Sequence, residues 1–185
     1  ILNDTNYTSI QNEMKLGENK VFFLPCLMGE RSPHNDVNAR GAFIGMSMDT
    51  TRVDMAQAVL EGVAFGIRDS FEIAKELGID IKRSKICGGG AKSDVWKTII
   101  CNVLGIELEV DLMEEGPALG ACILAMVGCN EYSSMQEAID AVVKVVNVIK
   151  PDKALSEQYN EKYELFKAMY PALKPVYELM ASKSN

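Results

Sequence analysis

The chain has 185 residues, of which 48% are apolar and 24% are charged. This composition indicates one globular domain, since about 150 residues per domain is usual, and it excludes a disordered tail or a collagen-like fibre. The formal net charge of −7 disfavours nucleic-acid binding by bulk electrostatics. No apolar run approaches the roughly 18 residues that a membrane span needs, so we expect neither a nucleic acid nor a membrane as partner.

The start of the chain and its cysteines indicate the extent of the chain, its metal content and its cellular location. The chain begins at Ile1 with no initiator Met and no signal-like segment, which favours a piece of a longer chain. The five cysteines form no C-x-x-C pair and His34 is the single histidine, so we predict no metal site. Each cysteine lies in an apolar stretch, which predicts small buried side chains and favours a reducing, cytoplasmic location.

The first half of the chain alternates short apolar runs with polar, turn-rich segments. The expected elements are, in chain order, a lead-in with at most one weak helix (1–20), a buried strand (21–24), a long polar surface loop (28–41) and a short strand (42–48). A long amphipathic helix then begins at a capping box over residues 51–54 and ends at Gly78.

The second half continues the alternation. The expected elements are a strand (85–87), a glycine turn (88–90), a helix from Ser93 to Gly105, a strand (106–111), a helix (117–128), a helix opening at Ser134, a strand (145–149) and a terminal helix. The helix over 117–128 is apolar on all sides, which predicts burial. An aromatic stripe from Tyr159 to Tyr170 predicts packing of the terminal helix, and Pro171 is expected to break it. Strands alternating with helices predict an α/β layer structure.

The glycine turn is the first candidate for chemistry. Three glycines between a strand and a helix N-terminus permit positive φ and let a ligand approach the backbone. The spacing fits neither G-x-G-x-x-G nor G-x-x-x-x-G-K-[ST], which excludes a dinucleotide fingerprint and a P-loop. Taken alone, such a run is a plain tight turn about as often as a ligand site.

The loop over residues 28–41 is the second candidate. It concentrates five ionisable or charged side chains, namely Glu30, Arg31, His34, Asp36 and Arg40. They could line a cleft, but a salt-bridged loop that holds its own shape is the favoured interpretation. No Ser or Cys nucleophile is spaced for a triad with His34. The residues by themselves therefore indicate a nucleotide-related α/β domain and no more.

Several ordered segments carry a resemblance to a known family. Residues 23–35 (FLPCLMGERSPHN) resemble the F-L-P-Y-L-x-G-E-R-[ST]-P segment of FGGY-family carbohydrate kinases, and residues 39–46 continue it. Residues 54–62 match the second signature of that family in residue type and spacing. Residues 88–96 (GGGAKSDVW) resemble its G-G-G-A-x-S-x-x-W adenosine motif, and residues 116–121 resemble its connecting helix. Four motifs in family order are far more specific than any one of them.

The resemblance implies a fold and a domain organisation. It implies an actin-like ATPase or ribonuclease H-like domain: a mixed sheet covered by helices, with further helices at the C-terminus. Residues 21–185 would be the C-terminal, nucleotide-side domain of a two-domain kinase, after the truncated lead-in over 1–20. The N-terminal kinase domain, absent from this chain, would be its partner. ATP, Mg²⁺ and a sugar would bind between the two domains. A second copy of the kinase, in a homodimer, is an alternative further partner.

The resemblance also implies an activity and its residues. The segments 32–35 and 116–120 look most like xylulose kinases, which implies phosphorylation of D-xylulose to D-xylulose 5-phosphate. Kinases for gluconate, ribulose or fuculose, and a non-catalytic actin-like nucleotide-binding module, are the alternatives. The catalytic aspartate and the phosphate loops belong to segments outside this chain, so no catalytic residue is assigned and the isolated chain should be inactive. The residues implied to contact the nucleotide are Gly88, Gly89, Gly90 and Ser93, and those implied to organise the cleft-side loop are Glu30, Arg31 and Arg40.

The chain departs from the family pattern at four positions. Cys26 replaces the usual Tyr and Cys122 the usual Ala, and both substitutions are interpreted as changes in packing. Cys101 and Asn102 replace the usual Ala-Asp pair. Asn102 thereby removes a carboxylate that could order the adjoining helix or loop, which puts the role of that position in doubt.

Overall fold

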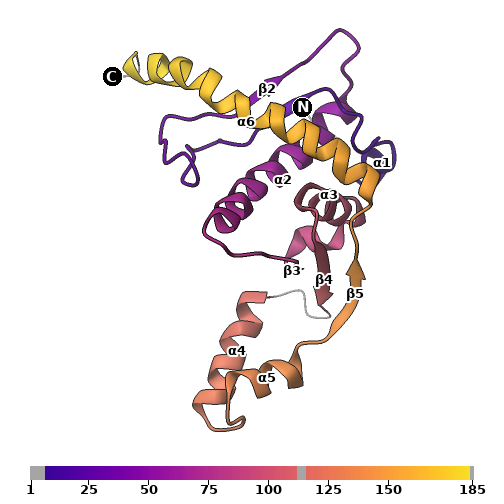
Figure 1. Ribbon diagram of the computed structural model, residues 1–185, viewed down its shortest axis with the longest axis vertical. Helices are drawn as coiled ribbons and strands as arrows, with labels where there is room; N and C mark the ends of the chain where they lie inside the picture. Colours follow the sequence, from indigo (N-terminus) through magenta and orange to yellow (C-terminus); the bar gives the residue numbers. More distant parts are fainter. Residues whose placement is uncertain (1–6, 112–115, 184–185) are drawn as a thin grey trace.

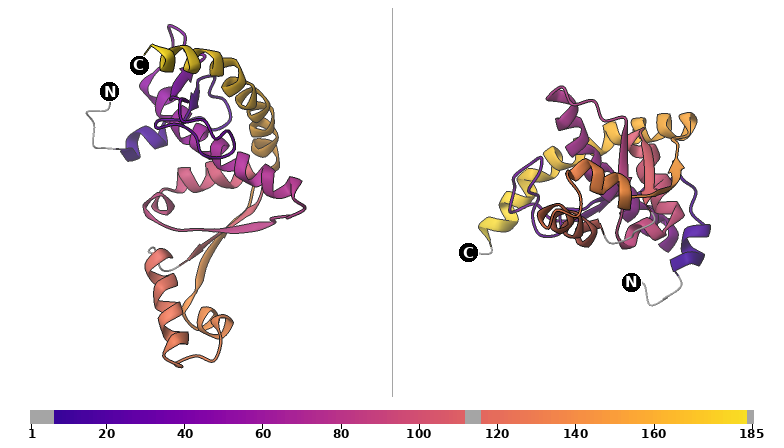
Figure 2. Two further views of the ribbon diagram at one scale, coloured as in Figure 1. Left: turned by 90° about the vertical axis from the view of Figure 1, so that its left-hand side faces the viewer. Right: turned by 90° about the horizontal axis from the view of Figure 1, so that it is seen from below.

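The computed structural model describes residues 7–111 and 116–183. The helices are α1 (Tyr7–Asn12), α2 (Arg52–Glu76), α3 (Asp94–Leu104), α4 (Gly116–Gly128), α5 (Met135–Val142) and α6 (Lys153–Ser182), with a 3₁₀ turn η1 (Gly89–Lys92). The strands are β1 (Phe22–Leu24), β2 (Ala42–Ile44), β3 (Arg83–Ile86), β4 (Glu107–Asp111) and β5 (Val145–Ile149). Figures 1 and 2 show α2, α3 and α6 gathered in one body, while α4 and α5 project from it beyond the ends of β4 and β5.

The strands form two small sheets. β1 and β2 pair antiparallel, and the order β3-β4-β5 combines a parallel with an antiparallel pair. One face of this mixed sheet turns Leu108 into the core with α3. The other face carries a charged ladder, in which Lys85 lies 2.7 Å from Asp111 and 3.6 Å from Glu109. The predicted mixed α/β class is confirmed, with helices packed on the sheet face that lacks the ladder.

The predicted boundaries of α2 are confirmed by its caps. The Thr51 hydroxyl accepts from the Asp54 amide, and the Asp54 carboxylate accepts from the Thr51 amide, which is a complete capping box. A left-handed Gly78 (φ +81°) follows the last turn. A Cβ at Gly62 would overlap the carbonyl oxygen of Phe23, so only glycine lets α2 approach β1 this closely. β2 is shorter than predicted, because Gly45 turns the backbone to φ +86°.

The terminal helix α6 packs its aromatic stripe into the core, as predicted. Tyr159 is fully buried, and Tyr170 is only 7% exposed. The expectation that Pro171 breaks the helix is wrong: α6 continues through it to Ser182. The continuation is anchored beyond the proline, because Tyr177 is buried and its hydroxyl donates to the Arg40 carbonyl at 2.7 Å. This tertiary contact compensates for the backbone hydrogen bond that a proline cannot make.

Asn102 orders the start of α6 although it lacks the carboxylate. Its Oδ1 accepts from the Asp152 amide at 2.7 Å and from the Ser156 hydroxyl at 3.2 Å. Its Nδ2 donates to the Thr98 carbonyl at 2.8 Å. An amide can donate as well as accept, so it joins α3 to α6 through both ends of one buried group.

The prediction that residues 117–128 form a buried helix is half wrong. The helix forms as α4, but among its side chains only Ile123 is buried. The reason is that α4 packs on the short α5 and projects from the body beyond its first residue (Figures 1 and 2). The prediction of buried cysteines also fails at three positions, since Cys87, Cys122 and Cys129 are exposed. No helix in the described part of the chain has both the length and the apolarity for crossing a membrane.

Candidate functional site

The glycine turn has one open side and one packed side. It leaves β3 through Gly88, whose φ of +84° requires glycine, and enters η1. A Cβ built on Gly88 or Gly89 would meet no atom within 4 Å, so the backbone here can be approached closely from outside. At Gly90 a Cβ would lie 2.9 Å from Nε1 of Trp96, so this glycine is required by the indole.

Ser93 ends the turn and caps α3, as predicted. Its Oγ accepts from the Trp96 amide at 3.1 Å, which satisfies one of the free donors of the first helical turn. The same hydroxyl donates to Oε1 of Gln11 on α1, also at 3.1 Å. The first turn of α3 carries Asp94, which pairs with Lys97 at 2.7 Å. A carboxylate already occupies the positive end of this helix, so the turn suits an uncharged group better than a phosphate.

The first residue of α4 lies beside this turn. A Cβ at Gly116 would come within 2.7 Å of the Cys87 sulfur, and Cys87 directly precedes Gly88. Two of the motifs noted in the sequence, residues 88–96 and 116–121, are therefore neighbours in space. Gly116 has no side chain, and this is what lets α4 begin so close to Cys87.

The loop between β1 and β2 holds its own shape, but by hydrogen bonds to the backbone. The backbones of Glu30 and Asp36 exchange two hydrogen bonds of 2.8 Å each. Nη1 of Arg40 donates to two loop carbonyls at 2.8 Å, those of Val37 and Ala39. The predicted salt bridges are absent: across residues 7–111 and 116–183, no described ion pair joins two charged side chains of this loop. Arg31 is exposed.

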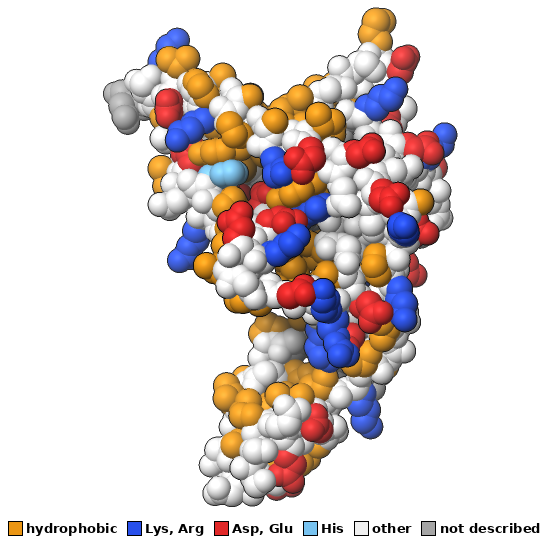
Figure 3. All heavy atoms as spheres, viewed as in Figure 1, with side chains coloured by type: hydrophobic (Ala, Val, Ile, Leu, Met, Phe, Trp, Pro, Cys, Tyr) orange, Lys and Arg blue, Asp and Glu red, His pale blue; other side chains and the backbone are white. Residues whose placement is uncertain are grey.

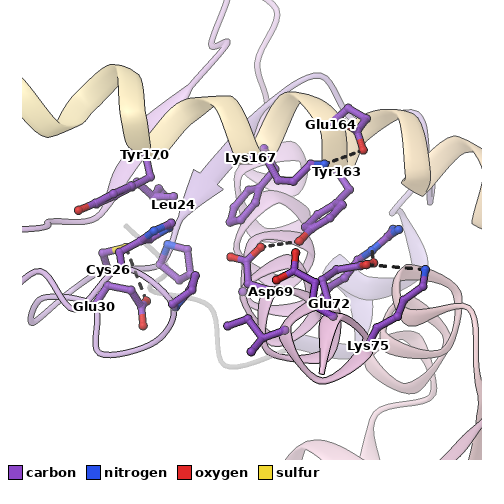
Figure 4. Close-up of a pocket in the computed structure, with 18 residues that line it drawn as sticks. Leu24, Cys26, Glu30, Asp69, Glu72, Lys75, Tyr163, Glu164, Lys167 and Tyr170 are labelled. Carbon is purple, nitrogen blue, oxygen red and sulfur yellow. Dashed lines mark hydrogen bonds and ion pairs between the residues drawn. The ribbon is translucent and has the colours of Figure 1, made fainter. Parts of the chain in front are cut away.

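A cavity of about 640 Å³ lies between this loop, α2 and α6. Figure 4 shows Cys26 and Glu30 on one side and Asp69 on the other, with tyrosines reaching in from α6. The Tyr163 hydroxyl donates to Asp69 at 2.6 Å. His34 stacks on the ring of Tyr170, with centroids 3.6 Å apart.

Burial raises the pKa values of several groups that line this cavity. Burial, reinforced by the charge of Glu30, raises the pKa of the Cys26 thiol to about 12, so the thiol stays protonated at neutral pH. Burial also raises the pKa of Asp69 above its usual range, against the hydrogen bond from Tyr163, which lowers it. The Tyr170 hydroxyl has its pKa raised to about 12, first by burial and then by its bond to Asp36. The cavity therefore offers polar contacts rather than covalent chemistry.

The structure separates the residues that the sequence singled out. Glu30 lines the cavity, whereas Gly88, Gly89, Gly90 and Ser93 do not. Sequence reasoning missed Asp69, which faces Glu30 across the cavity (Figure 4). Its spacing within α2, three residues before Glu72, would have indicated a polar edge beside the apolar face.

Within the described ranges, 7–111 and 116–183, no group of three or more His, Cys, Asp or Glu side chains is placed to hold a metal ion. The candidate site of this chain is therefore the glycine turn with the start of α4. Its chemistry is close backbone approach to an uncharged, flat or hydroxylated group. Among the described residues, this turn contains no cluster of oxygen ligands of the kind that Mg²⁺ prefers.

Comparison with known proteins gives the same family as the motifs. Residues 4–129 match the C-terminal domain of the FGGY family of carbohydrate kinases. The chain is 35% identical over 160 residues to a xylulose kinase of Staphylococcus epidermidis, covering 86% of this chain and 32% of that protein. It is 31% identical over 153 residues to an L-xylulose/3-keto-L-gulonate kinase of Escherichia coli, covering 83% and 30%.

A solved structure agrees with the sequence relatives. The crystal structure of a xyloylose kinase from Brucella ovis matches with a TM-score of 0.81 and 32% identity, over 91% of this chain and 35% of that one. The chain thus spans about a third of the length of the relatives it matches.

Proposed function

The chain belongs to the FGGY family of carbohydrate kinases, and on that premise we propose that residues 21–185, after the lead-in over 1–20, are the C-terminal, nucleotide-side domain of a cytoplasmic ATP-dependent sugar kinase. The substrate proposed is D-xylulose and the product D-xylulose 5-phosphate. The observation that carries the proposal is the open glycine turn. Gly88 and Gly89 present bare backbone beside a capped helix, which is what contact with a nucleoside requires.

The proposed roles of the residues follow from the geometry. Gly88 and Gly89 contact the adenosine through backbone atoms, and Gly90 keeps the turn against Trp96. Ser93 fixes the start of α3 and lies within the same turn as these contacts. The Asp94 carboxylate in the first turn of α3 would disfavour a phosphate at this helix end, so the turn would hold the nucleoside rather than the phosphates, and Mg²⁺ would be held with the phosphates by groups outside this turn. Glu30 and Arg40, with the exposed Arg31, shape the loop between β1 and β2.

The reaction itself needs groups that this chain does not supply. The sugar hydroxyl oxygen bonds to the γ-phosphorus of ATP, the bond from that phosphorus to the β,γ-bridging oxygen breaks, and the hydroxyl proton passes to a base. The resemblance assigns that base to an aspartate of the N-terminal kinase domain. Catalysis of this kind consists of positioning and electrostatic stabilisation, of which this chain contributes the hold on the nucleoside. We therefore expect no sugar-dependent ADP release from this chain alone.

The glycine turn is tested by Gly89→Val in the full-length kinase. Gly89 has no positive φ and no neighbour near its Cβ position, so valine fits the fold but fills the approach to the backbone. We expect the KM for ATP to rise while the Tm stays within about 1–2 °C of the parent. Ser70→Val, at an exposed position of α2, is the control and should leave the KM unchanged. A lower Tm with an unchanged KM for ATP would refute the nucleotide role.

The sugar is tested separately, because the support for it is likeness to xylulose kinases rather than a contact in this chain. The E. coli relative named for L-xylulose and 3-keto-L-gulonate makes a kinase for another sugar the second candidate. The measurement is kcat/KM at saturating MgATP for D-xylulose, L-xylulose, gluconate and L-ribulose. Preference for another sugar by about tenfold or more would reject D-xylulose and leave the kinase proposal intact.

A further inference from the structure

The sequence of helix α4 is typical of a buried helix, but most of the helix is exposed. Its sequence, GPALGACILAMVG, contains no charged residue and no hydroxyl or amide side chain. A helix that is apolar on every side is normally buried, yet α4 buries only Ile123. Leu124 is 63% exposed. The remaining exposed side chains of the helix include Ala118, Ala121, Cys122 and Ala125.

These four small residues recur at intervals of three and four, so they form one stripe along the helix. We call this stripe, together with Leu124, the arm face, and α4 with α5 the arm (residues 116–142). Figure 3 shows the contrast: charged side chains crowd the body of the molecule, whereas orange apolar side chains dominate the arm. A surface of small apolar residues lets another backbone approach closely, and it resembles a domain core cut in half rather than a transient interface.

Physical arguments decide whether a membrane or a protein surface covers the arm face. A membrane is excluded for α4, because 13 residues of helix span about 20 Å and the hydrocarbon core needs about 30 Å. The helix also lacks the polar face of an interfacial helix. A protein surface remains. The relatives are about three times as long as this chain, so a full-length kinase contains a large polypeptide beyond the region matched here.

We propose that the arm face docks against an apolar surface of the kinase polypeptide outside this chain, and that this contact forms one wall of the nucleotide site. The inference rests on the proposed function and deepens it. Continuity in space supports it: α4 begins at Gly116, against Cys87, one residue before the open glycine turn. A partner that covers α4 from its first turn therefore lies beside Gly88 and Gly89, whose outer side is open in this chain.

The test compares two leucines that are equally exposed here. Leu124 on α4 and Leu165 on α6 are 63% and 59% exposed, so Leu124→Asp and Leu165→Asp should each leave the Tm of this chain nearly unchanged. In the full-length kinase, Leu124→Asp places a charge in the docked face, and we expect a Tm lower by several degrees or a loss of soluble protein. Leu165→Asp should have little effect there. Equal effects of the two substitutions in the full-length kinase would overturn the proposal.

A second measurement does not disturb the docked face. In a Cys87→Ser/Cys129→Ser background, Cys122 is the remaining exposed thiol, while Cys26 and Cys101 are buried and have pKa values raised by burial. We expect a thiol reagent to modify Cys122 readily in this chain and at least about tenfold more slowly in the full-length kinase. Equal rates of Cys122 modification in the two proteins would refute docking. Docking would also be refuted if Cys122 became protected in this chain alone as the protein concentration rises, because a second copy would then cover the face. Both readouts are independent of the KM for ATP, so this proposal and the nucleotide proposal can fail separately.

Discussion

The buried ion pair between Lys162 and Glu61 ties three parts of the chain together and is open to a quantitative test. Lys162 on α6 donates to the Glu61 carboxylate on α2 and to the Asn19 carbonyl at 2.8 Å. The other carboxylate oxygen of Glu61 accepts from Tyr159 at 3.1 Å and from Gln57 at 2.7 Å. Glu61 belongs to the segment that matches the second signature of the family, so the structure assigns this part of the motif a role in stability.

Lys162→Met removes the cation and keeps most of the aliphatic packing. The side chains of Lys162 and Glu61 are 9% and 2% exposed, so the carboxylate is left in the interior with hydrogen bonds but no counter-charge. Removing one partner of such a pair costs about 3–5 kcal/mol of unfolding free energy. For a chain of this size, the loss corresponds to a Tm lower by roughly 6–20 °C.

The assay is thermal unfolding by circular dichroism, with one control variant on the same helix and one double variant. Lys167 pairs with Glu164 at 2.8 Å, but their side chains are 46% and 70% exposed, so Lys167→Met should cost about 0–1 kcal/mol. The double variant Glu61→Gln/Lys162→Met removes the stranded charge and keeps an acceptor for Tyr159 and Gln57, so it should recover most of the lost stability. Equal losses for Lys162→Met and Lys167→Met, or no recovery in the double variant, would refute the reasoning.

Two further predictions concern the cavity and the glycine turn. Burial raises the folded-state pKa of Asp69 above its ordinary 3.8, so its favourable contribution to folding is complete below that pH and is lost as the pH rises through the folded-state pKa. Asp69→Asn should therefore raise the Tm relative to the parent more at neutral pH than at about pH 4, and a pH-independent difference would contradict the assignment. Gln11→Ala removes the acceptor of the Ser93 hydroxyl at 3.1 Å while leaving the cap of α3. In the full-length kinase it should raise the KM for ATP two- to fivefold, by the roughly 0.5–1 kcal/mol of one hydrogen bond, and leave kcat unchanged; an unchanged KM would show that α1 does not position the turn.

Where an element is decided by local chemistry, the sequence predicted it well. The capping box at Thr51 and the limits of the helix from Ser93 to Gly105 are confirmed, because a helix end depends on residues within one turn of it. The aromatic stripe of α6 was also confirmed, since its period is set by the helix itself. The glycine turn was placed correctly, but which of its glycines is open and which is packed depends on Trp96, and spacing alone does not give the direction of that indole.

Elements decided by distant contacts were predicted poorly. Pro171 lies inside α6 because Tyr177 reaches a carbonyl 137 residues earlier in the chain, and no local rule contains that contact. The cavity escaped prediction for the same reason. Its walls come from the loop after β1, from α2 and from α6. Asp69 could not be recognised as a cavity residue from the sequence, because its hydrogen-bond donor Tyr163 lies on α6, 94 residues later.

The prediction that α4 is buried failed for a different reason, and that reason bears on function. The rule that an all-apolar helix is buried concerns the complete folded protein, and the sequence of α4 obeys it at every position. In the structure, however, α4 packs on the short α5, and Ile123 is its only buried residue. The contradiction disappears if the arm face meets polypeptide from outside this chain. Two open surfaces of the described part of the chain, the arm face and the outer side of Gly89, are then parts of one requirement: both are completed by kinase polypeptide outside this chain.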